Sequence, residues 1–198
     1  MARMTARQMW TAKLTGKSVP AAGAPAALAA RELLPRKAYA GVVLGIDPSL
    51  RGTGLALVDV RPGCAPVLIR SATVRVPAGR TMAIALAEIH RAVTGFLESA
   101  PAVRHVALEQ TIYVQNFRTA QILGAARGAA IAAAAIRGLP VFEYAPLRVK
   151  QAVTGSGRAS KEQLARTLAA YIGHTGKLGT DESDAAGVAL CHAFTWQP

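Results

Sequence analysis

Four carboxylates occupy positions in the sequence from which they could act together. Asp47 ends the short apolar run of residues 42–46, and Glu109 ends a second such run, residues 103–108. Asp181 and Asp184 lie three residues apart, so a helix would place both on one face of its first turn. Each acid alone also has a structural explanation, because Asp47 could be a hydrogen-bonding cap and an Asp-x-x-Asp pair favours a helix N-terminus.

Considered together, the four acids predict a metal centre. Carboxylates within about 4 to 6 Å of one another repel by roughly 4 kcal/mol per close pair at an effective dielectric near 20, so such a cluster needs cations. Ligands that offer only oxygen suit Mg²⁺ or Mn²⁺, which keep water molecules and accept phosphate oxygens. Two such ions would activate a water molecule and stabilise the leaving oxygen in phosphodiester cleavage.

The expected secondary structure would bring these acids to one end of a sheet. Residues 42–58 are typical of a β-hairpin with Asp47 at its turn, and residues 67–76 would add a third strand to an antiparallel meander. A helix over residues 80–97 leads to the strand that ends in Glu109, and this connection makes that strand parallel to the first. The remaining expected elements are a helix over residues 117–137, a strand over 139–144, a helix from about residue 160 and a last helix from about residue 180.

The same patterns predict roles for single side chains. The last helix would be N-capped by the hydroxyl of Thr180. Gly124 and Gly128 are spaced to let another helix approach closely, within the fold or across a dimer.

Cys64 and Cys191 show no metal-like spacing, which fits a reducing cytosol, and both are interpreted as packing residues. His90, His105, His174 and His192 are interpreted as structural or surface residues, and one face of the helix over 80–97 would bury Ile84, Ala87, Ile89, Val93 and Phe96.

The charge of the chain favours a polyanionic partner. It carries 23 Lys and Arg against 11 Asp and Glu, a net charge of +12. Half of this net charge lies in residues 1–40, whose Ala/Pro/Gly-rich stretch 20–30 predicts a flexible basic arm beside a nuclease domain of residues 41–198. The arm could be an idle extension, a segment that binds nucleic-acid backbone, or a transit peptide. No membrane association is expected, because the longest uncharged apolar run, residues 128–136, is too short to span a bilayer.

A second basic feature lies in residues 146–161. Arg148, Lys150, Arg158 and Lys161 flank a Gly-Ser-Gly turn at residues 155–157. Flexible backbone amides between cations suit a phosphate group, although a solvated basic loop would look the same.

Four segments carry a resemblance to a known family. G-I-D-P-S-L-R-G-T-G, A-L-E-Q, V-F-E-Y-A-P-L-R-V-K-Q-A-V-T-G-S-G-R-A-S-K and D-E-S-D-A-A resemble the bacterial RuvC Holliday junction resolvases in order and spacing, over residues 42 to about 195. The resemblance implies an α/β, RNase H-like fold with a five-stranded mixed sheet flanked by helices. It also implies a cytoplasmic bacterial homodimer that makes paired symmetric nicks in four-way DNA junctions during recombination and repair. Two Mg²⁺ ions per active site, replaceable by Mn²⁺, and a branch-migration helicase complex as a candidate partner belong to the same expectation.

The resemblance also assigns residues by position. Asp47, Glu109, Asp181 and Asp184 would be the catalytic metal ligands, and Lys150 and Lys161 would act beside them near the cut. Ser49 replaces a usual glycine of the family, which is expected to stiffen the first loop. Ile112 stands where the family places an aromatic residue that stacks on a junction base, a task that the neighbouring Tyr113 could perform. The full set of expected DNA-binding residues is Arg51, Ile112, Tyr113, Arg118, Arg148, Lys150, Arg158 and Lys161.

Three other functions stay open at this point. The chain could be an RNase H-like nuclease for another branched or hybrid nucleic acid, or a junction-binding protein that does not cut. A non-cutting protein would be expected to lack one of the acids, and all four are present. It could also be an ATP-using relative, although only the Gly-Thr-Gly of residues 52–54 suggests a phosphate loop.

Overall fold

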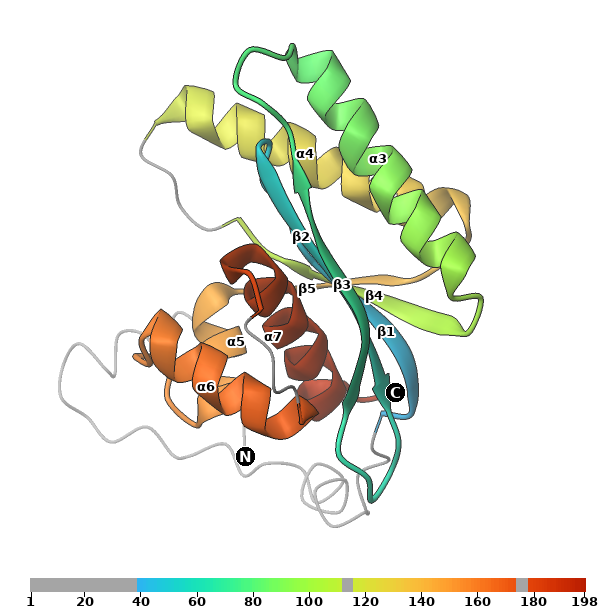
Figure 1. Cartoon of the computed structure of the whole chain (residues 1–198), viewed down its shortest axis with the longest axis vertical. Helices are drawn as coiled ribbons and strands as arrows, with labels where there is room; N and C mark the ends of the chain where they lie inside the picture. The colour runs from blue at the N-terminus through green and yellow to red at the C-terminus, as the bar shows by residue number, and fades with distance from the viewer. Residues whose placement is uncertain (1–38, 112–115, 174–177) are drawn as a thin grey trace, which may run out of the picture. The chain divides into compact units, whose positions relative to one another are not determined.

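The structure is a computed structural model that describes residues 39–111, 116–173 and 178–198 (Figure 1). The expected basic arm up to residue 38 lies outside the described residues, as do Ile112, Tyr113 and His174. In chain order the described elements are β1 (Gly41–Asp47), β2 (Gly52–Val60), β3 (Val67–Arg75), α3 (Met82–Ser99), β4 (Val103–Glu109), α4 (Phe117–Ile136), β5 (Val141–Tyr144), α5 (Pro146–Thr154), α6 (Lys161–Ile172) and α7 (Thr180–Thr195).

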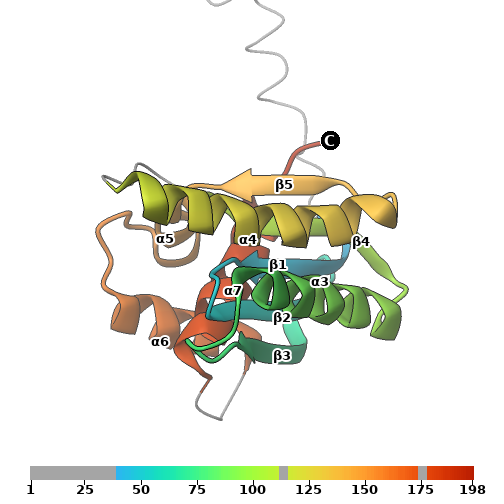
Figure 2. The same ribbon diagram turned by 90° about the horizontal axis from the view of Figure 1, so that it is seen from above.

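The strands form a mixed sheet with β1 at its centre, in the order β3-β2-β1-β4-β5 (Figure 2). β2 pairs antiparallel with both β1 and β3, whereas β4 runs parallel to β1 and β5 runs parallel to β4. This arrangement confirms the predicted meander followed by parallel strands. Because β1 and β4 are parallel neighbours, both strands end at the same edge of the sheet.

Helices cover both faces of the sheet (Figures 1 and 2). α3 and α4 pack on one face, where Leu44 and Ile46 of β1 are buried, and α5, α6 and α7 pack on the other, where Val43 is buried. Successive side chains of a strand point to opposite faces. Asp47, which follows Val43 at an even spacing, therefore points to the α7 side.

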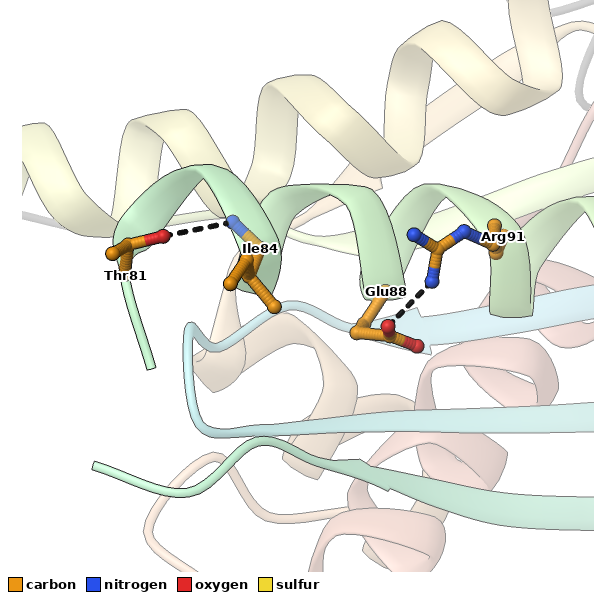
Figure 3. A network of polar contacts seen from close by, with 4 residues as sticks. All are labelled: Thr81, Ile84, Glu88 and Arg91. Carbon is orange, nitrogen blue, oxygen red and sulfur yellow. Dashed lines mark hydrogen bonds and ion pairs between the residues drawn. The ribbon is translucent and has the colours of Figure 1, made fainter. Parts of the chain in front are cut away.

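α3 begins where the side chain of Thr81 caps it, accepting a hydrogen bond from the backbone N–H of Ile84 at 3.4 Å (Figure 3). One turn later Arg91 pairs with Glu88 on the solvent side of the same helix. The predicted face was partly wrong. Ile84 is exposed and Ala87 is only half-buried, because the buried stripe is set by Ala85, Ile89, Val93, Phe96 and Leu97 instead.

α4 has the length and composition that would allow a helix to cross a membrane. In this fold it is a packing helix, because Ala126, Ala130, Ala133 and Ala134 line the core against α3 and the sheet. Its Arg127 pairs with Glu143. Gly124 and Gly128 are on the exposed side, and a Cβ built on either would meet nothing within 4 Å. Close helix approach at these glycines within the described fold is therefore excluded.

Three local expectations differ from the structure. The segment after β5 is helical as α5, because Pro146 is favoured in the first turn of a helix and the sequence offers no breaker before Gly155. Thr180 is the first residue of α7 rather than its cap. The N-cap is Gly179, and no side-chain cap bond is present. Cys64 is exposed instead of packed, whereas Cys191 is buried as expected.

Two histidines join a buried aromatic cluster on the α7 side of the sheet. His192 Nδ1 lies 2.8 Å from the Tyr144 hydroxyl, and His192 Nε2 lies 2.9 Å from His105 Nδ1. Burial lowers the pKa of His192 to about 4, so its neutral form links the two partners. Tyr39 and Trp196 pack edge-on against this cluster. These contacts confirm the structural interpretation of His105 and His192.

Candidate active site

The site begins with Asp47 and Glu109 at one end of the sheet. They directly follow Ile46 and Leu108, which are paired neighbours in β1 and β4. Their carboxyl groups are hydrogen-bonded to each other, with Asp47 as acceptor, and burial raises the pKa of both. For Glu109 the pKa rises to about 8, since the charge of Asp47 adds to the effect of burial. One proton is therefore held between the two groups near neutral pH.

Asp181 and Asp184 come from the start of α7, and their charges add to burial in raising the pKa of Asp47. The helix can approach so closely because β1 and β2 present glycines to it. A Cβ on Gly54, the partner of Asp47 across β1 and β2, would lie 1.9 Å from the backbone oxygen of Asp181. A Cβ on Gly52 would lie 3.0 Å from Asp181 Oδ2. Gly52 and Gly54 therefore leave room for the helix that carries the aspartates. In the sequence, the Gly-Thr-Gly of residues 52–54 was only a weak sign of a phosphate loop.

Lys161 is a cation that interacts directly with the acids. Its Nζ lies 3.1 Å from Asp184 Oδ2, and this hydrogen bond is the main reason that the pKa of Lys161 is raised. The charges of Asp47 and Glu109 act in the same direction. Lys161 is the first residue of α6, and a reciprocal capping box between Ser160 and Gln163 fixes the start of that helix.

A cavity of about 440 Å³ lies beside this ion pair, between α6 and α7. Lys161 and Asp184 line one part of it, and Arg166 adds a second cation. The site therefore opens beside a cavity that side chains of α6 and α7 line.

The turn between β1 and β2 is held rigidly next to Asp47. Ser49 Oγ accepts hydrogen bonds from the backbone N–H groups of Arg51 and Gly52, and its backbone oxygen accepts one from the Thr53 hydroxyl at 2.5 Å. These bonds support the expectation that serine stiffens this loop. The guanidinium of Arg51 donates to the backbone oxygens of Pro77 and Arg80, at 2.8 and 3.1 Å. Arg51 thus secures the loop before α3, a role that its sequence position did not indicate.

The remaining expected DNA-binding residues that the structure describes come from α4, α5 and the turn between α5 and α6. Lys150 of α5 is close enough to Glu162 for its charge to contribute to lowering the pKa of that acid, although the Ser160 hydroxyl is the main cause. Arg148 is exposed, with its Cζ 6.0 Å from the centre of the Tyr144 ring. Arg158 and Arg118 are exposed, the latter in the first turn of α4. Ile112 and Tyr113 lie outside the described residues.

The donor chemistry of the site fits a hard divalent cation. Carboxylates from β1, β4 and α7 meet where burial disfavours their charge, which is a setting that a cation relieves. Across residues 39–111, 116–173 and 178–198, no three His, Cys, Asp or Glu side chains are already placed around one ion position. Asp47 and Glu109 hold a proton between them, and Asp184 is paired with Lys161. Ion binding therefore requires the proton to leave and the ion pair to separate.

One polar contact near the site was not anticipated from the sequence. The hydroxyl of Ser71 on β3 donates to Glu182 Oε2 at 2.5 Å. Glu182 stands between the two aspartates of α7, and the sequence pattern assigns it no role of its own. No local pattern could have revealed the contact, because its partners are 111 residues apart.

Comparison with known proteins gives a consistent family. The family model described as "Crossover junction endodeoxyribonuclease RuvC" matches residues 43–192. The crossover junction endodeoxyribonuclease RuvC of Chromohalobacter salexigens is 40% identical over 158 residues, which cover 80% of this chain and 83% of that protein.

Solved structures agree with the sequence comparison. The structure described as T. thermophilus RuvC in complex with Holliday junction substrate is similar with a TM-score of 0.73 and 32% identity, covering 78% of this chain and 93% of that chain. The yeast mitochondrial Holliday junction resolvase is similar in fold alone, with a TM-score of 0.58 and 14% identity, over 92% of this chain and 89% of that chain. Together with the sheet order, these similarities confirm the predicted RNase H-like fold.

Proposed function

Because the chain belongs to the RuvC family of crossover junction endodeoxyribonucleases, we propose that it resolves four-way DNA junctions by paired symmetric nicks, in recombination and DNA repair. The observation that carries this proposal is the convergence of Asp47, Glu109, Asp181 and Asp184 from three elements at one end of the sheet. The junction as substrate is supported by the similar T. thermophilus RuvC, whose structure contains a Holliday junction substrate.

The four acids are proposed to hold two Mg²⁺ ions, with Mn²⁺ able to substitute. When bound, such ions supply an activated water molecule and stabilisation of the leaving oxygen of a phosphodiester. Ligands that offer only oxygen favour Mg²⁺ or Mn²⁺ over softer metals. The raised pKa of Glu109 means that this residue must lose its proton before it can act as an anionic ligand, so alkaline conditions favour the competent form of the site.

The lysines have separate tasks beside the acids. Lys161 neutralises Asp184 in the DNA-free protein, and on binding it is proposed to turn from that carboxylate toward a phosphate next to the cut. Lys150, which faces Glu162 from α5, would hold a neighbouring phosphate. Both contacts position the DNA backbone, and neither reads the base sequence.

The wider DNA surface is proposed to include Arg118, Arg148 and Arg158, which are all exposed. Two symmetric nicks need two symmetry-related sites, so the acting form is proposed to be a homodimer. A cytoplasmic location and a branch-migration helicase complex as partner complete the proposal.

The function is tested with four labelled substrates: a synthetic four-way junction, a Y-fork, a linear duplex and an RNA–DNA hybrid, each with Mg²⁺ and with EDTA. We expect paired nicks at symmetric positions of the four-way junction in Mg²⁺ alone. Preferential cleavage of the hybrid or the fork would assign the chain to a different nuclease activity. Tight junction binding without any cut would make it a binding protein.

A further inference from the structure

Glu182 has a position unlike that of the acids on either side of it. It lies in the first turn of α7, between Asp181 and the next aspartate, yet its Oε2 accepts a hydrogen bond from the Ser71 hydroxyl on β3 at 2.5 Å. β3 is an edge strand, two strands away from β1, which carries Asp47. At about 4.8 Å between strands, the carboxylate of Glu182 is directed to a point roughly 10 Å to the side of Asp47. Glu182 is therefore not placed to share a ligand position with Asp47.

The Ser71 bond ties the first turn of α7 laterally to the sheet. Its N-cap, Gly179, forms no side-chain cap bond. The close contact between Gly54 and the Asp181 backbone fixes how near the helix comes to the sheet. Packing of the buried residues 185–193 holds the body of α7, and the Ser71 bond adds a side-chain tie from the sheet to its first turn. Successive residues of a helix differ by about 100° around the axis, so a bond at Glu182 fixes the direction of Asp181 and Asp184 as well.

We infer that Glu182 is a positioning residue, held by Ser71, that sets the rotation of the first turn of α7 and so directs Asp181 and Asp184 toward Asp47. This inference rests on the proposed function, in which those aspartates hold divalent ions. Glu182 acts through the aspartates and touches neither the ion nor the DNA. The contact joins the outermost strand of the meander to the active site, so β3 contributes to the chemistry without supplying a ligand.

The neighbouring residue on β3 provides a matched control. Thr73 is two residues from Ser71 on the same face of the strand and is the cross-strand partner of Gly54. Its hydroxyl is buried but has no hydrogen-bond partner among the described residues. Thr73→Val removes a β3 hydroxyl beside α7 without removing an anchor.

The test compares Ser71→Ala, Glu182→Ala, Glu182→Gln, the double variant S71A/E182A and Thr73→Val with the wild type. Binding of Mn²⁺ to the DNA-free protein is measured by the loss of the electron paramagnetic resonance signal of free Mn²⁺. Junction cleavage is measured over a range of Mg²⁺ concentrations. We expect S71A and E182A each to weaken Mn²⁺ binding about tenfold and to raise the Mg²⁺ concentration for half-maximal cleavage by a similar factor. The double variant should be no worse than either single variant, because both remove the same bond.

Two controls separate positioning from other roles. Glu182→Gln keeps an oxygen acceptor and should bind Mn²⁺ nearly as well as the wild type, as should Thr73→Val. Unchanged Mn²⁺ binding in S71A and E182A, with only a lower melting temperature, would overturn the inference in favour of a purely structural bond. Weak Mn²⁺ binding by E182Q would also overturn it, because the charge of Glu182 would then be required. If the wild type does not cut junctions, the proposed function fails, while the Mn²⁺ titration still decides the role of Glu182.

Discussion

Asp47 and Glu109 leave two adjacent parallel strands side by side, and their carboxyl groups share a hydrogen bond that requires a proton. Two like charges in a half-buried site cannot both ionise without cost, so the DNA-free protein keeps this proton to a pH well above the usual range of a carboxyl group. A divalent ion would compete with the proton for the same oxygens. Proton release and metal binding are therefore coupled at this pair.

Neutral replacements of the acids should separate cutting from binding. Asp47→Asn, Glu109→Gln and Asp184→Asn are each expected to lower junction cleavage by at least about a hundredfold, because each removes an anionic ligand of the ions. Junction affinity measured in EDTA should not fall, since losing a negative charge does not weaken phosphate contacts. Asp59→Asn is the control, because Asp59 pairs with Arg61 at the far end of β2. Substantial cleavage by all three site variants would remove the assignment of these acids.

The stability of the metal-free protein should fall as pH rises. The folded-state pKa of Glu109, about 8, exceeds its ordinary value of 4.5, so the folded protein binds a proton that the unfolded chain releases. The stabilisation from this proton is complete below pH 4.5 and is lost as pH rises through 8. Urea denaturation in EDTA from pH 5 to about 9 should therefore show a smaller decline for Glu109→Gln than for the wild type. Equal pH slopes for the two proteins would show that Glu109 is not protonated in the fold.

The close contact between Gly54 and α7 leaves no room for a side chain at position 54. A methyl group there would overlap the backbone oxygen of Asp181, so Gly54→Ala must move α7 away from the sheet. We expect a loss of about 1 to 3 kcal/mol in the free energy of unfolding, together with weaker cleavage because the aspartates of α7 move with it. Gly95→Ala is the control, because a Cβ on Gly95 in α3 would meet nothing within 4 Å. It should stabilise the helix by up to about 1 kcal/mol. A Gly54→Ala protein as stable and active as the wild type would contradict the contact.

Much of this architecture could be predicted from local patterns. The apolar runs that end in Asp47 and Glu109, the alternation in β2 and the acidic start of α7 each have a period or a breaker that indicates the element type. The common end of β1 and β4 followed from the strand–helix–strand connection, which makes β4 parallel to the first strand. For this reason the four acids could be grouped before their positions in space were known.

Contacts between distant segments could not be predicted in the same way. Hydrogen bonds such as Ser71 to Glu182 and Arg51 to the Pro77 carbonyl depend on register and on loop path, which one sequence does not encode locally. The sequence shows a glycine at position 54, but only the packed structure explains why a larger residue does not fit there, because α7 approaches the strand at this point. α5 was missed since its cations and the following Gly-Ser-Gly turn are equally typical of a loop.

The open face of α4 is a candidate interface for the proposed homodimer. Gly124 and Gly128 are exposed and meet no atom of the described fold, so a partner helix could approach there. Gly128→Leu is expected to weaken dimerisation by tenfold or more, roughly, because a large side chain prevents close approach of the two backbones. Gly95→Leu is the matched control, as an exposed helical glycine on α3. Sedimentation of both variants over a dilution series measures the effect. A Gly128→Leu protein that dimerises like the control would exclude this face as the interface.

The basic arm should contribute attraction to DNA without choosing the cut. Residues 1–40 hold half of the net charge of the chain but none of the four acids or the two lysines assigned to the site. Each phosphate contact releases counterions, so removing the arm should weaken junction binding most at low salt and flatten the dependence of log affinity on log salt concentration. The positions of the nicks should not change, because phosphate contacts carry no sequence information. The measurement is junction affinity of the full chain and of a chain lacking residues 1–38, from about 50 to 200 mM salt, with the cut positions mapped in parallel. An unchanged salt slope would make the arm an idle extension, and a shifted cut would mean that it recognises the structure of the junction.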